Sequence, residues 1–370
     1  MKKALFAAST LSHIQNFHLP YLRALGALGW EIWVAVGAPD DAQPVLLPEA
    51  DQLVLLPLRK QLLSPQNLRA IFAARRLLRA QQFDLVSVHT TLAAAVVRAG
   101  ALLLAAEQRP PLISVCHGYL FGQAGGLKRL LYLLPEKLCA RVTSRLLVMN
   151  REDEQIAQRN QLCAAGIYYI NGMGLDTSRL ILPDPQQRQA GRAALGFSAD
   201  TFLFVYAAEF SHRKNQQELI RAFAAVAPQI PHAKLLLAGK GALLERCKQQ
   251  VQELGIQQQI LFPGYLSMRE VYPLCDAAVS SSRIEGMPFN LMEALAFGLP
   301  VVASDIKGHR DLLAGCEGSW LYQGGQQLEK ALVQAATKQK PPRQSLPEQY
   351  TLEAVLPQVM THYLETAGEL

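Results

Sequence analysis

The stretch SSSRIEGMPFNLMEALAFGLP, residues 280–300, decides the fold of this chain. An apolar run at residues 277–279 leads into it and predicts a buried strand. From Asn290, which we interpret as the N-cap, leucine and alanine recur at helical spacing. Gly298 and Pro300 predict the end of that helix. The stretch therefore predicts a strand, a polar loop and a helix N-terminus in direct succession.

A helix N-terminus that follows a strand favours the binding of a negatively charged group. Backbone N–H groups and the positive end of the helix dipole point towards such a ligand. Gly286 lets the main chain approach the ligand because it carries no Cβ. Glu285 on the loop and Glu293 one turn into the helix supply carboxylates that accept hydrogen bonds from hydroxyl groups. The combination predicts a sugar nucleotide, although early acids that only complement a helix dipole would show the same spacing.

The composition is that of a globular protein with two domains. The chain has 370 residues, of which 50% are hydrophobic and 18% are charged. No apolar run reaches the roughly 20 residues that cross a bilayer. The start, MKKALFAASTL, has a basic tip like a signal peptide, but its apolar segment is short. His13, Asn16 and His18 follow where a cleavage site would lie, so we expect a first buried strand there.

Cysteine usage and net charge limit the compartment and the partners. The six cysteines are scattered and form no close pair, which favours a reducing compartment and hence a cytoplasmic protein. The net charge of +6 favours anionic partners. Because no nucleic-acid motif is present, we expect acidic substrates or an anionic membrane surface instead.

Strand-like and helix-like segments alternate along the whole chain. Strands are predicted near residues 4–8, 31–36, 53–58, 83–89, 112–116, 146–149 and 168–171, and again near 202–206, 233–238, 260–262, 277–279, 300–303 and 319–322. This alternation predicts an α/β protein with two Rossmann-like, doubly wound domains that face each other across a cleft. We place the first domain at residues 1–171 and the second at 172–350, with a linker across residues 171–192.

In parallel sheets of this kind, ligands bind beyond the carboxyl ends of the strands. In the first half, His13 and Asn16 follow the first strand, His89 ends the fourth, and His117 follows the fifth. One histidine would most often be a structural hydrogen-bonding residue, whereas several at one sheet edge indicate a ligand site. His117 is the best candidate because Gly118 frees the backbone beside it.

Two further segments combine charge with a defined position. Arg213 and Lys214 precede a predicted helix and would clamp a diphosphate together with its N–H groups, unless they are merely exposed basic residues. Residues 125–141 are both apolar and basic, as in a helix on an anionic membrane surface or a core-facing helix with a solvated basic side. Pro135 is expected to interrupt that helix.

Beyond these separate motifs, the chain resembles the retaining glycosyltransferases of family 4, which have the GT-B fold. The resemblance begins with Glu, seven residues and Glu at positions 285 and 293. It extends to CHGYLFGQAGG from Cys116, to HIQNFHLPYLRALGALGWEIWVAVG from His13, and to NGMGLD from Asn171. These motifs follow the order of the family and cover essentially the whole chain. The segments around His13 and His117 are similar to members that act in exopolysaccharide, capsule and lipopolysaccharide biosynthesis.

The resemblance implies a role for each motif. Glu285 would contact the donor sugar and act with His117, which would lie beside the anomeric carbon. Glu293 would hold the nucleotide ribose, and Lys214 would be the lysine of the diphosphate clamp. The other implied site residues are Arg213, Gly286, Met287, Pro288, Phe289, Asn290 and Leu291 for the diphosphate, Tyr265 and Leu266 for the base, and His13, Asn16, His89, Gly172 and Gly174 for the cleft and acceptor.

One position departs from the family pattern. Many members have an arginine where this chain has Glu209, and the sequence leaves open whether Arg213 replaces it. The resemblance also implies that residues 1–171 form the acceptor-side domain and residues 172–350 the nucleotide-sugar domain. Residues 351–370 would form a helix that packs back towards the first domain.

The implied reaction is transfer of a hexosyl group from a nucleoside diphosphate sugar, expected to be a UDP-sugar, to a hydroxyl acceptor with retained configuration. We expect no cofactor and no metal, and an acceptor that is a lipid-linked or soluble glycan at the inner face of the plasma membrane. A sugar-nucleotide 2-epimerase on the same fold and a non-catalytic binding subunit remain alternatives. A dehydrogenase is disfavoured because no Gly-x-Gly-x-x-Gly turn follows the first strand.

Overall fold

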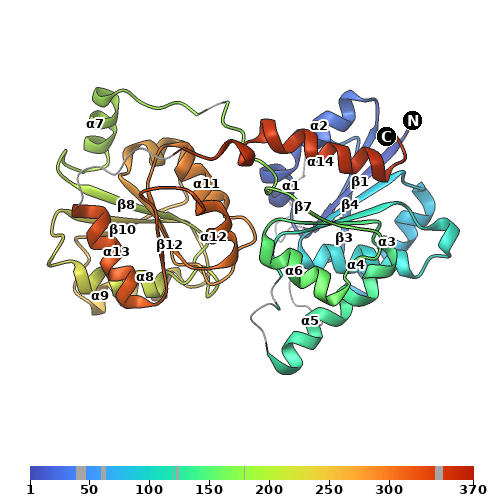
Figure 1. Cartoon of the computed structure of the whole chain (residues 1–370), viewed down its shortest axis with the longest axis horizontal. Helices are drawn as coiled ribbons and strands as arrows, with labels where there is room; N and C mark the ends of the chain where they lie inside the picture. Colours follow the sequence, from blue (N-terminus) through green and yellow to red (C-terminus); the bar gives the residue numbers. More distant parts are fainter. Residues whose placement is uncertain (39–46, 60–63, 120, 122–124, 179, 338–344) are drawn as a thin grey trace. The chain divides into compact units, whose positions relative to one another are not determined.

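The computed structural model describes residues 1–38, 47–59, 64–119, 121, 125–178, 180–337 and 345–370. Contacts divide the chain into two compact units (Figure 1). Unit 1 comprises Met1–Gly174 and Leu352–Leu370, and unit 2 comprises Leu175–Thr351. The chain therefore leaves unit 1 and later returns to it. Leu175 and Thr351, at the two crossings, form a parallel bridge, and the Leu175 N–H donates to the Tyr350 carbonyl at 2.9 Å.

Unit 1 contains a seven-stranded parallel sheet in the order β3-β2-β1-β4-β5-β6-β7. Its strands are β1 (Lys3–Ala8), β2 (Glu31–Gly37), β3 (Gln52–Leu56), β4 (Leu85–His89), β5 (Leu112–Cys116), β6 (Arg145–Val148) and β7 (Ile167–Tyr169). Its α-helices are α1 (Leu11–Phe17), α2 (Leu19–Ala27), α3 (Pro65–Gln81), α4 (Thr91–Leu102), α5 (Gly126–Cys139), α6 (Arg151–Asn160) and α14 (Leu352–Thr366). Two short 3₁₀ helices, η1 (Ala106–Gln108) and η2 (Ala140–Val142), complete the unit.

Unit 2 contains a six-stranded parallel sheet in the order β10-β9-β8-β11-β12-β13. Its strands are β8 (Phe202–Ala207), β9 (Ala233–Ala238), β10 (Ile260–Gly264), β11 (Ala277–Ser280), β12 (Val301–Ser304) and β13 (Trp320–Tyr322). Its α-helices are α7 (Pro185–Ala194), α8 (Gln216–Val226), α9 (Leu244–Glu253), α10 (Met268–Val271), α11 (Phe289–Ala296), α12 (Lys307–Leu313) and α13 (Gly325–Thr337). The 3₁₀ helices are η3 (Tyr272–Leu274) and η4 (Glu348–Tyr350).

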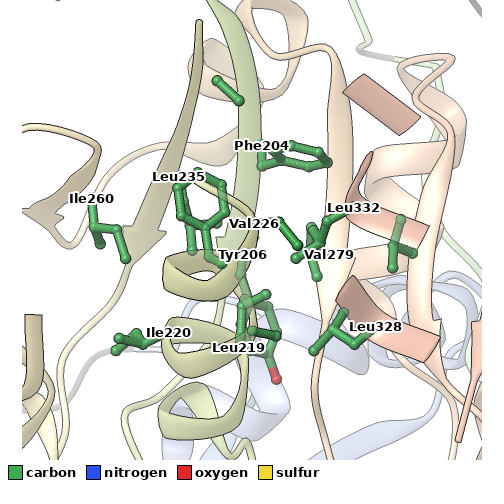
Figure 2. Packing of buried hydrophobic residues seen from close by; sticks show 14 of the residues in the cluster. Phe204, Tyr206, Leu219, Ile220, Val226, Leu235, Ile260, Val279, Leu328 and Leu332 are labelled. Atoms are coloured by element: carbon green, nitrogen blue, oxygen red, sulfur yellow. The ribbon is translucent and has the colours of Figure 1, made fainter. Parts of the chain in front are cut away.

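The core of unit 2 fixes the strand ends from which the site loops start. Phe204 on β8 and Val279 on β11 pack against Leu219 of α8 and against Leu328 and Leu332 of α13 (Figure 2). All five side chains are fully buried. Parallel strands that are covered on both faces read as continuous apolar runs, which is why the sequence predicts these strands well.

The structure corrects the predicted start of the helix after Glu285. Helix α11 begins at Phe289, and Pro288 rather than Asn290 is its N-cap residue. The Pro288 carbonyl accepts hydrogen bonds from the N–H groups of Leu291 and Met292 at 3.0 and 3.1 Å. Proline suits this position because its φ is already restricted and the helix does not need its missing N–H.

Two other expectations about helices are wrong. Helix α5 continues through Pro135, which lies inside it without ending it. The segment expected to be a linker contains α7, which Asp184 caps with a side-chain hydrogen bond to the Gln187 N–H at 2.8 Å. Arg188 and Arg192 on α7 form ion pairs with Asp276 at 2.7 and 3.0 Å, which hold the helix against unit 2.

The described helices give no sign of a membrane span. None of them is both long enough and apolar enough to cross a bilayer.

Candidate active site

The polar centre of unit 2 is a buried carboxylate that contacts two cations. Glu285 lies in the loop after β11 and receives a hydrogen bond from Arg213 Nη1 at 2.9 Å and another from Lys214 Nζ at 2.5 Å. The side chains of Glu285 and Lys214 are 7% and 12% exposed, whereas that of Arg213 is 43% exposed. The loops after two neighbouring strands, β8 and β11, thus bring three predicted site residues together.

Two side-chain hydroxyl groups form hydrogen bonds with the backbone carbonyl of Lys214. Tyr206 at the end of β8 donates its phenolic O–H to the Lys214 carbonyl at 2.9 Å, and Ser281 donates to the same carbonyl at 3.1 Å. Asn215, the next residue, has a φ of 54° and is the N-cap of α8. Tyr206 and Ser281 are not among the predicted site residues, although both lie within or beside the predicted motifs. Their burial, which requires hydrogen-bond partners, is the signal that points to them.

Burial and charge act in opposite directions on the two central groups. Burial by itself would raise the pKa of Glu285, but the positive charges of Lys214 and Arg213 outweigh it and lower that pKa to about 2. Burial lowers the pKa of Lys214, while the Glu285 carboxylate opposes this shift. The three side chains together carry one net positive charge, because two cations face one carboxylate.

The loop that carries Glu285 is held by the start of α12. A Cβ atom at Gly308 would lie 2.3 Å from the Gly286 carbonyl oxygen, so only glycine lets the two segments approach this closely. His309 is fully buried and anchors the same corner, with Nδ1 2.8 Å from the Ser304 carbonyl and Nε2 3.3 Å from Ser280 Oγ. Burial lowers the pKa of His309 to about 4, so it acts as a neutral hydrogen-bonding group.

Glu293, the predicted ribose ligand, lies on α11 in a different electrostatic setting. Burial raises its pKa to about 7, and Arg269 opposes this shift only in part. Glu293 is therefore a carboxyl group that exchanges its proton near neutral pH, in contrast to Glu285. A group of this kind becomes a good hydrogen-bond acceptor when hydroxyl donors approach it.

The loops after β9 and β10 complete the predicted nucleotide region. Gly241 packs against the loop after β8: its φ is 152°, and a Cβ there would lie 2.4 Å from the Phe210 carbonyl oxygen. Tyr265, which follows β10, is 80% exposed, and Leu266 is half-buried. Glu209 is exposed, while Arg213 contacts Glu285. The contacts of these side chains with a base or a diphosphate stay predictions.

Unit 1 gathers histidines at the carboxyl ends of its central strands. His13, His89 and His117 come together as predicted, and His18, which is not among the predicted site residues, joins them. The ring centroids of His13 and His117 are 4.6 Å apart, and those of His18 and His89 are 3.8 Å apart. Strands β1, β4 and β5 are neighbours in the sheet, which explains why loops distant in sequence meet here.

The four rings differ in burial, and this bears on one prediction. His89 is completely buried, so the prediction that its side chain lines the acceptor cleft is wrong. Asn16 is exposed on α1, and its acceptor role stays a prediction. Burial lowers the pKa of His18, His89 and His117 well below the usual value and that of His13 to about 4. The cluster is therefore neutral at physiological pH.

Comparison with known proteins identifies the chain. Residues 17–167 match the family described as "Glycosyl transferase 4-like domain", and residues 187–349 match "Glycosyl transferases group 1". EpsD of Bacillus subtilis (strain 168), which carries the name of a glycosyltransferase, is 32% identical over 326 residues, 88% of this chain and 84% of EpsD. The chain belongs to the GT-B glycosyltransferases. This finding does not favour the epimerase and the non-catalytic subunit.

Solved structures support the fold of this glycosyltransferase. Sucrose-phosphate synthase from Thermosynechococcus elongatus matches it with a TM-score of 0.81 and 20% identity over all of both chains. HepE of Anabaena, crystallised in complex with UDP and glucose, matches with a TM-score of 0.77 and 19% identity, also over all of both chains. A galactosyltransferase of Escherichia coli, named for UDP-Gal and GlcNAc-diphosphoundecaprenol, is 22% identical over 67% of the glycosyltransferase and 64% of the relative.

The segment that ends the first part of unit 1 has the backbone that its glycines predict. Gly172 and Gly174 have φ angles of 74° and 70°, which favour glycine. Tyr21 donates its phenolic O–H to the Met173 carbonyl between them at 2.9 Å. The glycosyltransferase thus holds this segment in a fixed conformation, and its contact with the acceptor stays a prediction.

Proposed function

We propose that this glycosyltransferase transfers a hexosyl group from a UDP-sugar to a lipid-linked glycan in bacterial surface polysaccharide synthesis, with retained anomeric configuration. The observation that carries the proposal is the buried contact of Glu285 with Lys214 and Arg213 beside the start of α11. The names of the related galactosyltransferase and of the HepE complex support UDP as the nucleotide. We place the reaction in the cytoplasm, in keeping with the six free cysteines.

The cations of this site suit a departing diphosphate. Lys214 has three N–H donors, of which one contacts Glu285, so others remain for phosphate oxygens. Arg213 supplies further donors, and the start of α11 adds its dipole. Donors that are already in place when charge develops on the leaving group lower the barrier most. The proposal therefore assigns the stabilisation of the diphosphate to these groups rather than to a bridging metal ion.

The proposed transfer breaks the bond from the sugar C1 to the phosphate oxygen and forms a bond from C1 to the acceptor oxygen. Glu285 is a poor proton acceptor because its pKa is about 2, so its role is to orient the sugar hydroxyls. The acceptor proton passes instead to the departing phosphate oxygen, which balances the reaction without a protein base. His117 is proposed to donate a hydrogen bond to the donor sugar, as the family resemblance implies.

The experiment that tests this function starts from a panel of nucleotide sugars. We expect the glycosyltransferase to be stabilised against thermal unfolding by UDP-sugars more than by GDP- or ADP-sugars, also when EDTA is present. Transfer assays with the stabilising donor and a diphosphoundecaprenol-linked sugar should then yield an α-linked product that retains the donor configuration. An inverted product, or an epimerised sugar with free nucleotide, would reject the proposal.

Helix α5 supports an acceptor that is linked to a lipid. Five of its leucines are 44–83% exposed: Leu127, Leu130, Leu131, Leu134 and Leu138. Exposed apolar residues that gather on one element mark an interaction surface. Helix α5 is tied to α4 by a buried ion pair at 2.7 Å between Arg98 and Glu136, so its position in unit 1 is defined.

A groove of about 550 Å³ lies beside these leucines and is lined by α3, α4 and α5. Ile71, Val96 and Leu134 contribute to its largely apolar lining, one from each helix. Arg129 and Lys137 on α5 are exposed. An apolar groove with adjacent cations suits the isoprenoid chain and the diphosphate of a lipid-linked sugar at an anionic membrane surface.

Replacing Leu127 and Leu130 together by glutamate should weaken flotation of the protein with anionic vesicles by about tenfold or more, because two apolar contacts are lost and negative charge is added. Leu254→Glu, a change of an exposed leucine in unit 2, serves as the matched control and should float like the wild type. Equal binding of all three proteins, or no binding of the wild type, would contradict membrane attachment through α5.

A further inference from the structure

The histidine cluster of unit 1 contains buried ring nitrogens that lack hydrogen-bond partners. Five of its ring nitrogens are buried without a hydrogen-bond partner: His13 Nε2, His18 Nδ1, His18 Nε2, His89 Nδ1 and His117 Nε2. Leaving a buried polar atom without a partner costs about 1–3 kcal/mol of folding free energy, so such atoms normally have a hydrogen-bond partner or bind a ligand. His309, the fully buried histidine of unit 2, shows the usual arrangement, with partners at both nitrogens.

The four rings converge. One nitrogen from each of the four rings can be chosen so that all four atoms lie within 4.8 Å of one another. In the described part of the chain, this cluster contains only imidazoles and no carboxylate or thiolate. Four neutral nitrogen donors are a ligand set for a borderline transition-metal ion, whereas magnesium and calcium prefer oxygen.

One ring already has the second partner that metal-binding histidines need. His89 places Nε2 3.0 Å from Ser87 Oγ, and the fully buried Tyr363 hydroxyl lies 3.3 Å from the same oxygen. Such a contact at one nitrogen fixes the ring and directs the other nitrogen towards a metal. For His89, the nitrogen that remains is Nδ1, which is one of the unpaired atoms.

We propose that His13, His18, His89 and His117 bind one transition-metal ion, with Zn²⁺ as its most suitable representative. Zinc with four protein nitrogens is tetrahedral, with Zn–N distances of about 2.0–2.1 Å and hence N···N distances of roughly 3.4 Å. Pairs of nitrogens at the outer limit of the present spacing approach each other by roughly 1.4 Å on binding, which ring rotation provides. Four protein ligands leave no open position, so the ion positions the loops after β1, β4 and β5 and does not activate a substrate.

The proposed ion would also fix which ring nitrogen of His117 carries the proton. Coordination through Nε2 leaves the ring proton on Nδ1, so His117 remains a hydrogen-bond donor. The metal site stands on the geometry of unit 1 alone, and its uptake of metal is measured without a sugar nucleotide. Its failure is therefore distinguishable from failure of the proposed transfer reaction.

The test uses the full chain, made without a histidine tag, freed of metal with a chelator and then titrated with Zn²⁺ alone. We expect one zinc ion per chain to remain through gel filtration, and the Tm to rise by on the order of 5 °C. Co²⁺ in place of zinc should give the intense visible absorption of a tetrahedral site. His13→Gln and His89→Gln should each lower zinc affinity by about 100-fold or more, because loss of a mere supporting contact already costs 10–100-fold.

His232→Gln, a change of an exposed histidine in unit 2, is the matched control and should bind zinc like the wild type. His13 is only half-buried, so its variant keeps the test valid even if His89→Gln fails to fold. The circular dichroism spectrum of metal-free His13→Gln should equal that of the metal-free wild type. Absence of retained zinc in the wild type, or equal retention by wild type and His13→Gln, would overturn the proposal.

Discussion

Replacing Lys214 by alanine is expected to lower kcat/KM for sugar transfer by about 10²–10³-fold, the usual cost of removing one preorganised donor from a developing negative charge. The loss should appear mainly in kcat, because the charge on the leaving diphosphate is largest in the transition state. The substitution also removes the shorter of the two contacts of Glu285 with a cation. Steady-state kinetics with the identified donor and acceptor measure the effect.

One further variant tests whether a positive charge at position 214 is enough for activity, and a second serves as a control. Lys214→Arg keeps a cation beside Glu285 and should retain part of the activity, while Lys330→Ala changes an exposed lysine of α13 and should behave like the wild type. Breaking a buried ion pair costs about 3–5 kcal/mol, so the free energy of unfolding of Lys214→Ala must be measured beside its rate. A folded Lys214→Ala protein that turns over at the wild-type rate would disprove the clamp.

The second large effect is a pH dependence of donor binding through Glu293. With a pKa of about 7 in the free protein, Glu293 is half-protonated at neutral pH, and two hydrogen bonds from a ribose diol favour its charged form. Binding therefore releases a proton, and the affinity should fall by about tenfold for each pH unit below 7 until the pKa of the complex is reached. Calorimetry in buffers of different ionisation enthalpy counts the proton. A UDP-sugar is the suitable ligand because it lacks a terminal phosphate with a pKa of about 6.

Glu293→Gln is the matched variant, since it keeps the shape of the side chain and cannot ionise. It should bind the donor weakly and without this pH dependence. It should also be more stable than the wild type above pH 7, by about 3 kcal/mol at most, because the shift of the Glu293 pKa from 4.5 to about 7 disfavours the charged carboxylate in the folded state. In the wild type, the folded state keeps a proton between pH 4.5 and 7 that the unfolded state has lost, so its free energy of unfolding falls as pH rises. A pH-independent affinity of the wild type would refute the ribose role.

The sequence predicted the parts of this molecule that depend on contiguous residues. The strands appear as apolar runs because both faces of each sheet are covered, and Glu285 and Glu293 stand in one continuous motif. Lys214 was found in the same way, from its position before a helix. Its contact with Glu285 needed the structure, because the two residues are 71 positions apart and meet only through the pairing of β8 with β11.

The errors have physical reasons of the same kind. Pro135 lies inside α5 without ending it, and α11 starts before Asn290 with Pro288 as its N-cap residue, so the residue types alone did not locate these helix ends. His89 was expected at a surface because it ends a strand, but the ring stacks on Phe6 and is fully covered. His18 lies in the quoted segment that starts at His13, but the resemblance assigns it no role, and only the fold brings it to the other three histidines.

Because the chain returns to unit 1 at its C-terminal end, unit 1 cannot complete its fold during translation until unit 2 has been synthesised. Tyr363 on α14 is fully buried against Phe6 of β1, with a ring distance of 5.6 Å, and lies beside Ser87 of β4. These partners are synthesised early in translation, whereas α14 is synthesised after the whole of unit 2. The ion pair of Lys2 with Glu369 likewise forms only after the C-terminal residues have been synthesised. Unit 2 is one uninterrupted segment, so it completes its fold while the apolar surface around Phe6 is still uncovered. The nascent N-terminal half therefore depends longest on protection against aggregation.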